Sequence, residues 1–161
     1  MRKLVGGTTV LAGFALLAIA ATALATSSVG VTSTPIAQGN AGDIDVRVKT
    51  GEWKVKLDTK GPSTLAVSEN RVAPGGDFGW HSHPGPSLVI VKSGTSTFYR
   101  GDDPDCTPEV HPAGTAYVDP GGVVHIARNE GSQELVVLVT RLTPAGAPPR
   151  NDEPDPGNCD F

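Results

Sequence analysis

Short stretches of alternating apolar and polar residues, divided by glycine and proline, run along most of the chain. In one of the first, Ile44, Val46 and Val48 alternate with charged residues. This period of two predicts β-strands, because successive side chains of a strand point to opposite faces. No segment shows a long apolar period of 3.6 residues, so the pattern predicts an all-β sandwich or barrel. The expected strands cover residues 44–48, 53–57, 65–72, 78–83, 88–91, 95–100, 115–118, 123–127 and 135–142.

Two of these segments, residues 88–91 and 135–139, are continuously apolar rather than alternating. Continuous apolar runs are typical of strands that are covered on both faces. The outer cover could be a second subunit, or it could be the N-terminal strands and the tail of the same chain. A homodimer is therefore one of two alternatives that the pattern leaves open.

Residues 1–25 have the features of a cleavable signal peptide. Arg2 and Lys3 precede an apolar run, and a small-x-small cleavage pattern ends at Ala25. This predicts a secreted or otherwise extracytoplasmic protein. An uncleaved membrane anchor is the alternative, because no charged residue stands between Lys3 and Asp43. The apolar run is short for a membrane span, which needs about 20 residues, and alanine, glycine and threonine dilute it.

The charge of the remaining chain argues against several classes of partner. Cleavage would remove two of the 13 basic residues and none of the 17 acidic ones, so the net charge changes from −4 to 11 − 17 = −6. An acidic chain without a basic run is unsuited to nucleic acids or to an anionic membrane surface. The remaining length of about 136 residues fits one domain. Its first part, residues 26–42, is small, polar and uncharged, and we expect a flexible lead-in there.

The chain has two cysteines, Cys106 and Cys159. In an exported protein the expected state of such a pair is a disulfide. This bond would fasten the tail, residues 144–161, which is rich in proline and glycine. Two free thiols, or a Cys106 that lies near a metal, are the alternatives.

Three of the four histidines fall within two short segments that are suited to a metal site. His81 and His83 are two residues apart in a predicted strand, so their side chains leave the same face. His125 begins another strand, just after a predicted turn at residues 119–122. If the two strands pair, three neutral imidazoles converge, and such a set can bind Fe, Mn, Zn, Ni or Cu. The alternative is a surface pair and an unrelated core histidine.

The spacing of these histidines also resembles the two sequence motifs of the cupin family, G-x5-H-x-H-x3-E-x6-G and G-x5-P-x-G-x2-H-x3-N. The matching positions are Gly75, His81, His83, Gly94, Gly114, Pro120, Gly122, His125 and Asn129. The chain resembles a small single-domain cupin of the type-2 conserved-barrel family, in an exported bacterial form. The resemblance implies a double-stranded β-helix, or jelly-roll barrel, over residues 43–143, with the tail 144–161 after it. It also implies that His81, His83 and His125 bind a divalent transition metal.

One position departs from the first motif, because Ser87 stands where the family has glutamate. A divalent ion held by three neutral histidines would keep its full charge of +2, and it should favour a small anionic or polar ligand at its open positions. Asp77 could replace the missing carboxylate in principle. Its place after the glycine-rich residues 74–76 fits a turn residue better.

The fourth histidine, His111, lies outside both motifs and directly before Pro112. A residue that precedes proline favours an extended backbone. We expect His111 to be solvated at a sheet edge and not to bind the metal.

The resemblance does not identify the reaction. It implies a small-molecule oxygenase-type metalloenzyme, similar to dioxygenase cupins; alternatives are a non-catalytic, metal-dependent module that binds a carboxylate or a sugar, or a structural cupin without metal. The family glutamate is absent, and the spacing requires no other inward carboxylate that could act as a general base. Catalytic residues and substrate therefore stay unassigned.

Overall fold

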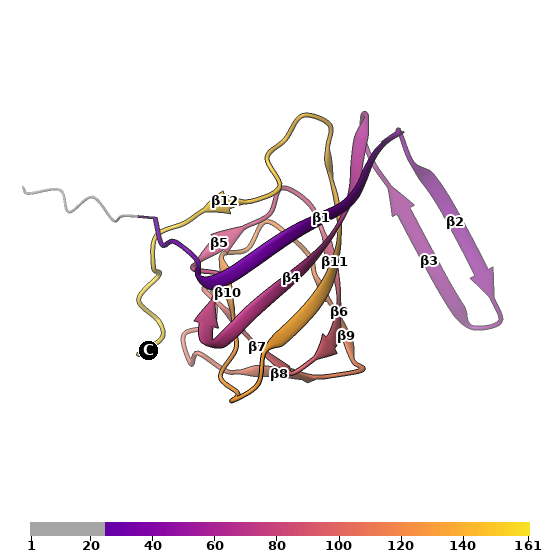
Figure 1. Cartoon of the computed structure of the whole chain (residues 1–161). Helices are drawn as coiled ribbons and strands as arrows, with labels where there is room; N and C mark the ends of the chain where they lie inside the picture. Colours follow the sequence, from indigo (N-terminus) through magenta and orange to yellow (C-terminus); the bar gives the residue numbers. More distant parts are fainter. Residues whose placement is uncertain (1–24) are drawn as a thin grey trace, which may run out of the picture.

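The computed structural model describes residues 25–161, which form strands and turns only (Figure 1). Apart from Ala25, the predicted signal peptide lies outside the described residues. Within the described range there is no helix with the length and apolar character needed to cross a membrane. The strands are β1 (Val29–Gly42), β2 (Asp45–Thr50), β3 (Trp53–Asp58), β4 (Ser63–Asp77), β5 (His81–Ser82), β6 (Ser87–Ser93), β7 (Thr95–Arg100), β8 (Glu109–Pro112), β9 (Ala116–Asp119), β10 (His125–Arg128), β11 (Leu135–Pro144) and β12 (Asn151–Asp152).

Ten of the strands form one antiparallel sheet that curves around a common interior (Figure 1). The main order is β12-β5-β10-β4-β11-β6-β9, with β1 on β4, and with β7 between β10 and β8. The prediction of an all-β jelly-roll barrel is confirmed.

The alternation of side chains along β4, β6 and β11 builds the apolar core. Its buried members are Val72, Val89, Val91, Leu135, Val137 and Val139. On β6, Leu88 and Ile90 point outward and are about half exposed, at 51% and 52%. The expectation that residues 88–91 are covered on both faces is therefore wrong for this chain by itself, whereas on β11 the outward Val136 is buried. The homodimer stays a prediction.

Residues 26–42 are not a flexible lead-in, because most of them form β1. This strand pairs with β4 along its whole length, from Val29 opposite Asp77 to Gly42 opposite Ser63. Backbone hydrogen bonds can hold an edge strand whose side chains do not alternate between apolar and polar. The sequence of β1 has no such alternation, so its side-chain pattern did not predict a strand. Val31 also packs against the core. The barrel therefore begins before residue 43.

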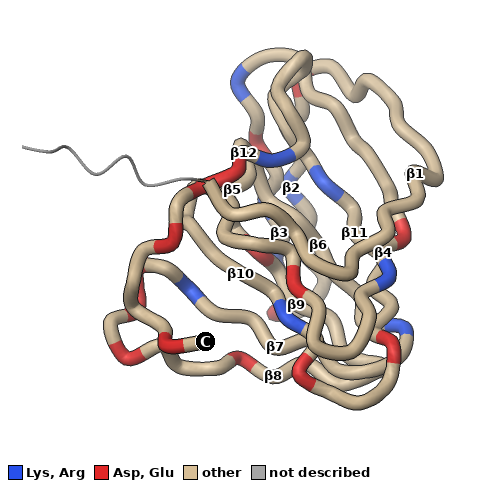
Figure 2. Tube along the Cα trace, turned by 60° about the vertical axis from the view of Figure 1, so that its left-hand side comes forward, with Lys and Arg blue, Asp and Glu red and all other residues tan. Residues whose placement is uncertain are grey.

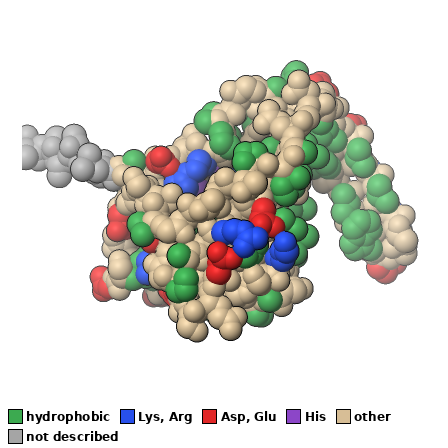
Figure 3. Space-filling model, viewed as in Figure 1, with side chains coloured by type: hydrophobic (Ala, Val, Ile, Leu, Met, Phe, Trp, Pro, Cys, Tyr) green, Lys and Arg blue, Asp and Glu red, His purple; other side chains and the backbone are tan. Residues whose placement is uncertain are grey.

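The next two strands are real, but they are not part of the barrel. β2 and β3 form a separate hairpin that projects from it (Figure 1). Val46 lies opposite Leu57 and Val48 opposite Val55, so one face of the hairpin is apolar. These side chains are exposed, and Figure 3 shows hydrophobic side chains along the projecting strands. Alternation identified the strands correctly, but it does not reveal what an apolar face packs against.

The tail is part of the barrel wall. Cys106 and Cys159 form a disulfide with their Cα atoms 5.3 Å apart. β12 pairs with β5, and the ring of Phe161 stacks on Trp80 with their centroids 6.2 Å apart. Figure 2 shows acidic residues gathered along the tail and the loops beside it. The predicted staple thus fixes a segment that makes tertiary contacts of its own.

We expect Cys159→Ser to lower the free energy of unfolding by up to about 4 kcal/mol, because the bond closes a loop of some 50 residues in the unfolded chain. The barrel should still form, since its long core strands all precede the tail. Urea denaturation of the variant and the parent measures the difference. Thiol titration of the denatured, unreduced parent should find no free thiol, and two thiols per chain would contradict the bond.

Candidate metal centre

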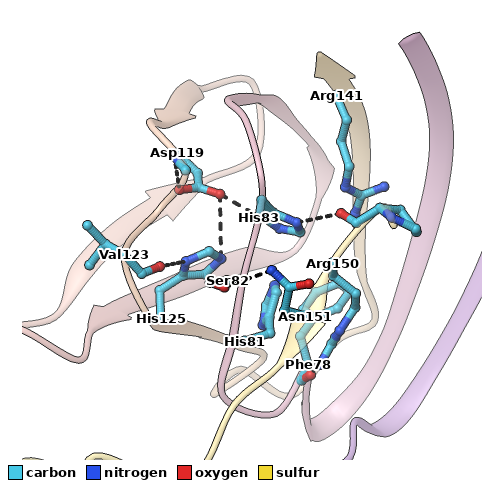
Figure 4. A network of polar contacts seen from close by, with 12 residues as sticks. Phe78, His81, Ser82, His83, Asp119, Val123, His125, Arg141, Arg150 and Asn151 are labelled. Atoms are coloured by element: carbon cyan, nitrogen blue, oxygen red, sulfur yellow. Dashed lines mark hydrogen bonds and ion pairs between the residues drawn. The ribbon is translucent and has the colours of Figure 1, made fainter. Parts of the chain in front are cut away.

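The structure brings the three predicted histidines together inside the barrel (Figure 4). His81 on β5 and His125 on β10 are direct register partners, and their ring centroids lie 4.3 Å apart. The ring of His83, which follows β5, lies 4.8 Å from that of His81 and 5.2 Å from that of His125. All three side chains are buried.

Glycine-containing turns on both sides of the cluster allow this convergence. Gly121 has a φ of +79°, and a Cβ there would lie 2.6 Å from the carbonyl oxygen of Gly85. The turn before β10 can therefore pack against the segment after His83 only with glycine at this position. The same turn is fastened by a hydrogen bond in which the Gly122 N–H donates to the His83 carbonyl at 2.9 Å.

The ring orientation of each histidine is fixed by a backbone carbonyl. The contacts are His81 Nδ1 to Gly79 at 2.8 Å, His83 Nδ1 to Pro149 at 2.7 Å, and His125 Nδ1 to Val123 at 2.9 Å. A carbonyl oxygen can only accept, so Nδ1 carries the proton and donates, and Nε2 keeps its lone pair. This is the usual arrangement of histidines that bind a metal through Nε2.

Burial keeps all three histidines neutral. Burial, with a smaller contribution from the neighbouring His125, lowers the pKa of His81 to about 2. Burial likewise lowers the pKa of His83 to about 4 and that of His125 below its usual value, although Asp119 opposes both of these shifts. At neutral pH each ring is therefore in the form that a metal requires.

A carboxylate that the sequence did not predict also faces the histidines. Asp119 Oδ2 lies 3.5 Å from His125 Nε2 and 3.7 Å from His83 Nε2 (Figure 4). The side chain of Asp119 is 3% to 4% exposed, and Oδ2 has no hydrogen-bond partner among the described residues. The other oxygen, Oδ1, accepts a hydrogen bond from the Gly121 N–H at 2.9 Å. This turn therefore holds the carboxylate with its free oxygen directed at the cluster.

Asp119 lies one strand away from the position where the family has glutamate. In the pairing of β6 and β9, Ser87 is the direct partner of Asp119. The motif spacing required no inward carboxylate, and the structure places Asp119 beside the histidines. The pattern Asp-Pro-Gly-Gly indicated only a turn. Whether the Asp119 side chain points toward the histidines depends on a strand register that the sequence does not specify. Asp77 has the turn role expected for it, since its Oδ1 accepts a hydrogen bond from the Gly79 N–H at 2.7 Å.

The donor set fits a divalent transition ion. One nitrogen from each histidine lies within 4.8 Å of the others. Two ligand atoms with bonds of about 2.1 Å to one ion can be no more than about 4.2 Å apart, so the rings have to move closer together to bind an ion. The cavity between them has a volume of about 40 Å³. Three imidazoles and an unpartnered carboxylate oxygen form a set that Fe, Mn, Zn, Ni or Cu can use.

His111 lies apart from this cluster, but it is not solvated as expected. Its ring stacks on Tyr117 with their centroids 4.1 Å apart, and its side chain is only 19% exposed. The tyrosine ring covers a histidine that sequence context alone placed at an exposed edge. His111 is therefore a partly buried histidine outside the candidate site, which makes it a useful control.

Between pH 6.5 and pH 5 we expect the metal-free protein to lose stability as the pH falls. The unfolded chain takes up protons on these histidines near pH 6.5, whereas folded His83 does so only near pH 4 and His81 near pH 2. The unfolded state thus binds more protons, and each such histidine contributes a slope of up to about 1.4 kcal/mol per pH unit. Urea denaturation in the presence of a chelator, repeated across this range, measures the slope, and a flat profile would contradict the burial of neutral histidines.

The chain is similar to one protein-family model and to several solved structures. The family model described as Cupin domain matches residues 69–141. No curated protein matches the chain significantly. Among solved structures, a cupin superfamily protein from Desulfitobacterium hafniense has 14% identity and a TM-score of 0.49, with 70% of this chain and 77% of that chain covered. A cupin domain from Bordetella pertussis has 23% identity and a TM-score of 0.43, with 63% of this chain and 94% of that chain covered. A conserved protein of unknown function from Streptococcus pyogenes has 18% identity and a TM-score of 0.48, with 72% of this chain and 76% of that chain covered.

Proposed function

The chain belongs to the cupin family, as a single-domain type-2 member, and on this premise we propose that it is an extracytoplasmic metalloprotein. It binds one divalent transition ion through His81, His83 and His125, with Asp119 as a fourth ligand. The observation that carries this proposal is the buried, unpartnered Asp119 Oδ2, which faces three neutral imidazoles. The disulfide and the signal-like residues 1–25 support the extracytoplasmic location.

Contacts within the protein orient the four proposed ligand side chains. Three backbone carbonyls hold the histidine rings, and the turn at Gly121 holds Asp119. Such outer contacts fix the ligand orientation and reduce the rearrangement on binding. With ionised Asp119 the net charge of the centre is +1 rather than +2. Its preference for anions is therefore weaker than the sequence alone predicted.

For an ion with six coordination positions, such as iron or manganese, four protein ligands leave positions free for a small molecule. When bound, an ion of this class supplies Lewis acidity and, if it is redox-active, electrons for oxygen chemistry. Open sites with histidine and carboxylate ligands are typical of non-haem iron oxygenases. We therefore propose an oxygenase-type reaction on a small molecule as the activity. The unpartnered Asp119 Oδ2 also gives the site a carboxylate that the sequence did not reveal.

Two measurements on the purified protein test this function. Elemental analysis should find one transition metal per chain; a protein that neither contains nor takes up a metal would be a structural cupin. Oxygen uptake by the iron-loaded protein, screened over small acids and thiols, should then identify a substrate. Tight binding of a screened compound without any oxygen uptake would instead favour a binding module.

A further inference from the structure

The cavity beside the histidines has more unpartnered polar atoms than a metal would use. Besides Asp119 Oδ2, four buried side-chain atoms that line it have no hydrogen-bond partner among the described residues. They are Asn70 Oδ1, Asn70 Nδ2, Ser87 Oγ and Arg141 Nε. Asn70 is buried and only 1% exposed. Because buried polar groups in proteins are nearly always hydrogen-bonded, this concentration in one cavity indicates a bound polar molecule.

Arg141 is the cation of this group. Among residues 25–161 it forms no ion pair, and its one side-chain hydrogen bond is a long one, 3.4 Å to Ser68 Oγ. The nearby Arg150 is different, because it donates to the Phe78 carbonyl and forms an ion pair with Asp152. A partly buried guanidinium without a counter-ion attracts an anion. Within the described part of the chain Arg141 thus has no counter-ion, whereas Arg150 is paired with Asp152 and only its Nε is without a hydrogen-bond partner.

Strand register places Arg141 in line with the metal centre. Arg141 on β11 is the direct partner of Ser87 on β6, and Ser87 is the direct partner of Asp119 on β9. Adjacent strands are about 4.8 Å apart, so the Cα atoms of Arg141 and Asp119 are separated by about 10 Å, with Ser87 between them. In the view of Figure 4, Arg141 and Asp119 lie on opposite sides of His83. A small molecule that lies along this row could contact both ends.

A larger pocket adjoins the metal cavity at the same side chains. Its volume is about 410 Å³, and it lies against β1, β4, β11 and the tail at Pro149 and Arg150. Asn70 and Arg141 line both this pocket and the histidine cavity. The volume is within the range of sites for small organic molecules. These two side chains therefore stand at the boundary between an outer binding space and the metal centre.

We propose that this site binds a small organic carboxylate. The carboxylate pairs with the guanidinium of Arg141, because the planar fork of donors matches two carboxylate oxygens. The Asn70 amide and the Ser87 hydroxyl bind further polar groups of the same molecule, and its far end points toward the histidines. Only this last contact rests on the proposed metal-dependent function; the Arg141 pairing does not.

The test uses succinate, glycolate and acetate as probes, with succinamide as a neutral match for succinate. Binding is measured by calorimetry, with the zinc-loaded and the metal-free full chain, after the metal content of every sample has been determined. Arg141→Gln should weaken carboxylate binding at least tenfold and leave the zinc content unchanged. Asn70→Leu should weaken it as well. The matched control is Arg71→Gln, since Arg71 is an exposed arginine that pairs with Glu69 and Glu134 outside the site.

The outcomes separate this inference from the proposed function. At least one carboxylate that binds the parent, with loss in Arg141→Gln but not in Arg71→Gln and with no binding of succinamide, supports the site. Equal binding to the parent and Arg141→Gln overturns it, and so does the absence of carboxylate binding in a zinc-loaded protein. If the parent takes up no metal, the metal-dependent function fails, and Arg141-dependent binding to the metal-free chain then decides the inference alone.

Discussion

His83→Ala is expected to abolish stoichiometric metal binding. Loss of a partner that only orients a metal ligand lowers affinity by about 10- to 100-fold, and the loss of a ligand itself should exceed this. The His83 ring lies within 5.2 Å of both other rings. The fourth histidine, His111, lies outside the cluster, so no other imidazole can replace His83. Metal content after dialysis and competition with a coloured chelator measure the effect.

His111→Ala is the matched control, because it removes the fourth histidine of the sequence without touching the cluster. Its metal content should equal that of the parent, even though the loss of the stacking contact with Tyr117 lowers stability somewhat. Similar metal content in both variants would show that the three histidines do not form the binding site.

Asp119→Asn is expected to weaken metal binding by at least about tenfold. This is the smallest loss of metal affinity that is typical when a residue that only orients a metal ligand is replaced. The substitution keeps the shape of the side chain and an oxygen that can accept from the Gly121 N–H, but it removes the negative charge beside His83 and His125. The ion should then regain its full charge of +2. Azide should accordingly bind the cobalt-loaded variant more tightly than the cobalt-loaded parent, which a spectroscopic titration measures.

Two further variants define the role of Asp119. Asp77→Asn changes another aspartate that caps a glycine N–H, but outside the cluster, and it should leave both metal and azide affinity unchanged. Ser87→Glu combined with Asp119→Asn returns the carboxylate to the position where the family has it, since these residues are direct partners across β6 and β9. The double variant should recover metal affinity. If Asp119→Asn alone binds metal as tightly as the parent, the carboxylate is not a ligand.

The tail links the disulfide to the candidate site. The Pro149 carbonyl accepts a hydrogen bond from His83 Nδ1, and Arg150 donates a hydrogen bond to the Phe78 carbonyl. Both residues belong to the segment that Cys159 fastens to Cys106. The sequence explained the disulfide as a means of holding a tail that lacks a fold of its own. In the structure, the held segment also orients His83, a proposed metal ligand.

The sequence by itself determined the features that depend on local geometry. Alternation along the chain indicated an all-β fold, because side chains of a strand alternate between its faces. The two-residue spacing of His81 and His83, and the turn before His125, placed three imidazoles where one strand pairing could join them. Two cysteines behind a predicted export signal indicated the bond between Cys106 and Cys159. Each of these inferences needs only a few neighbouring residues or a count.

Only the tertiary structure decided which distant residues complete the site and which strands build the barrel. Asp119 faces the histidines because β9 pairs with β6 in one register, and a shift of one residue would turn its side chain to the other face. The separate pairing of β11 with β6 aligns Arg141 with Ser87. β1 joins the barrel through backbone hydrogen bonds, which leave no trace in side-chain pattern, while the apolar face of β2 and β3 stays exposed. Pairing between strands far apart in the chain is a property of the whole fold, so the local pattern could not reveal it.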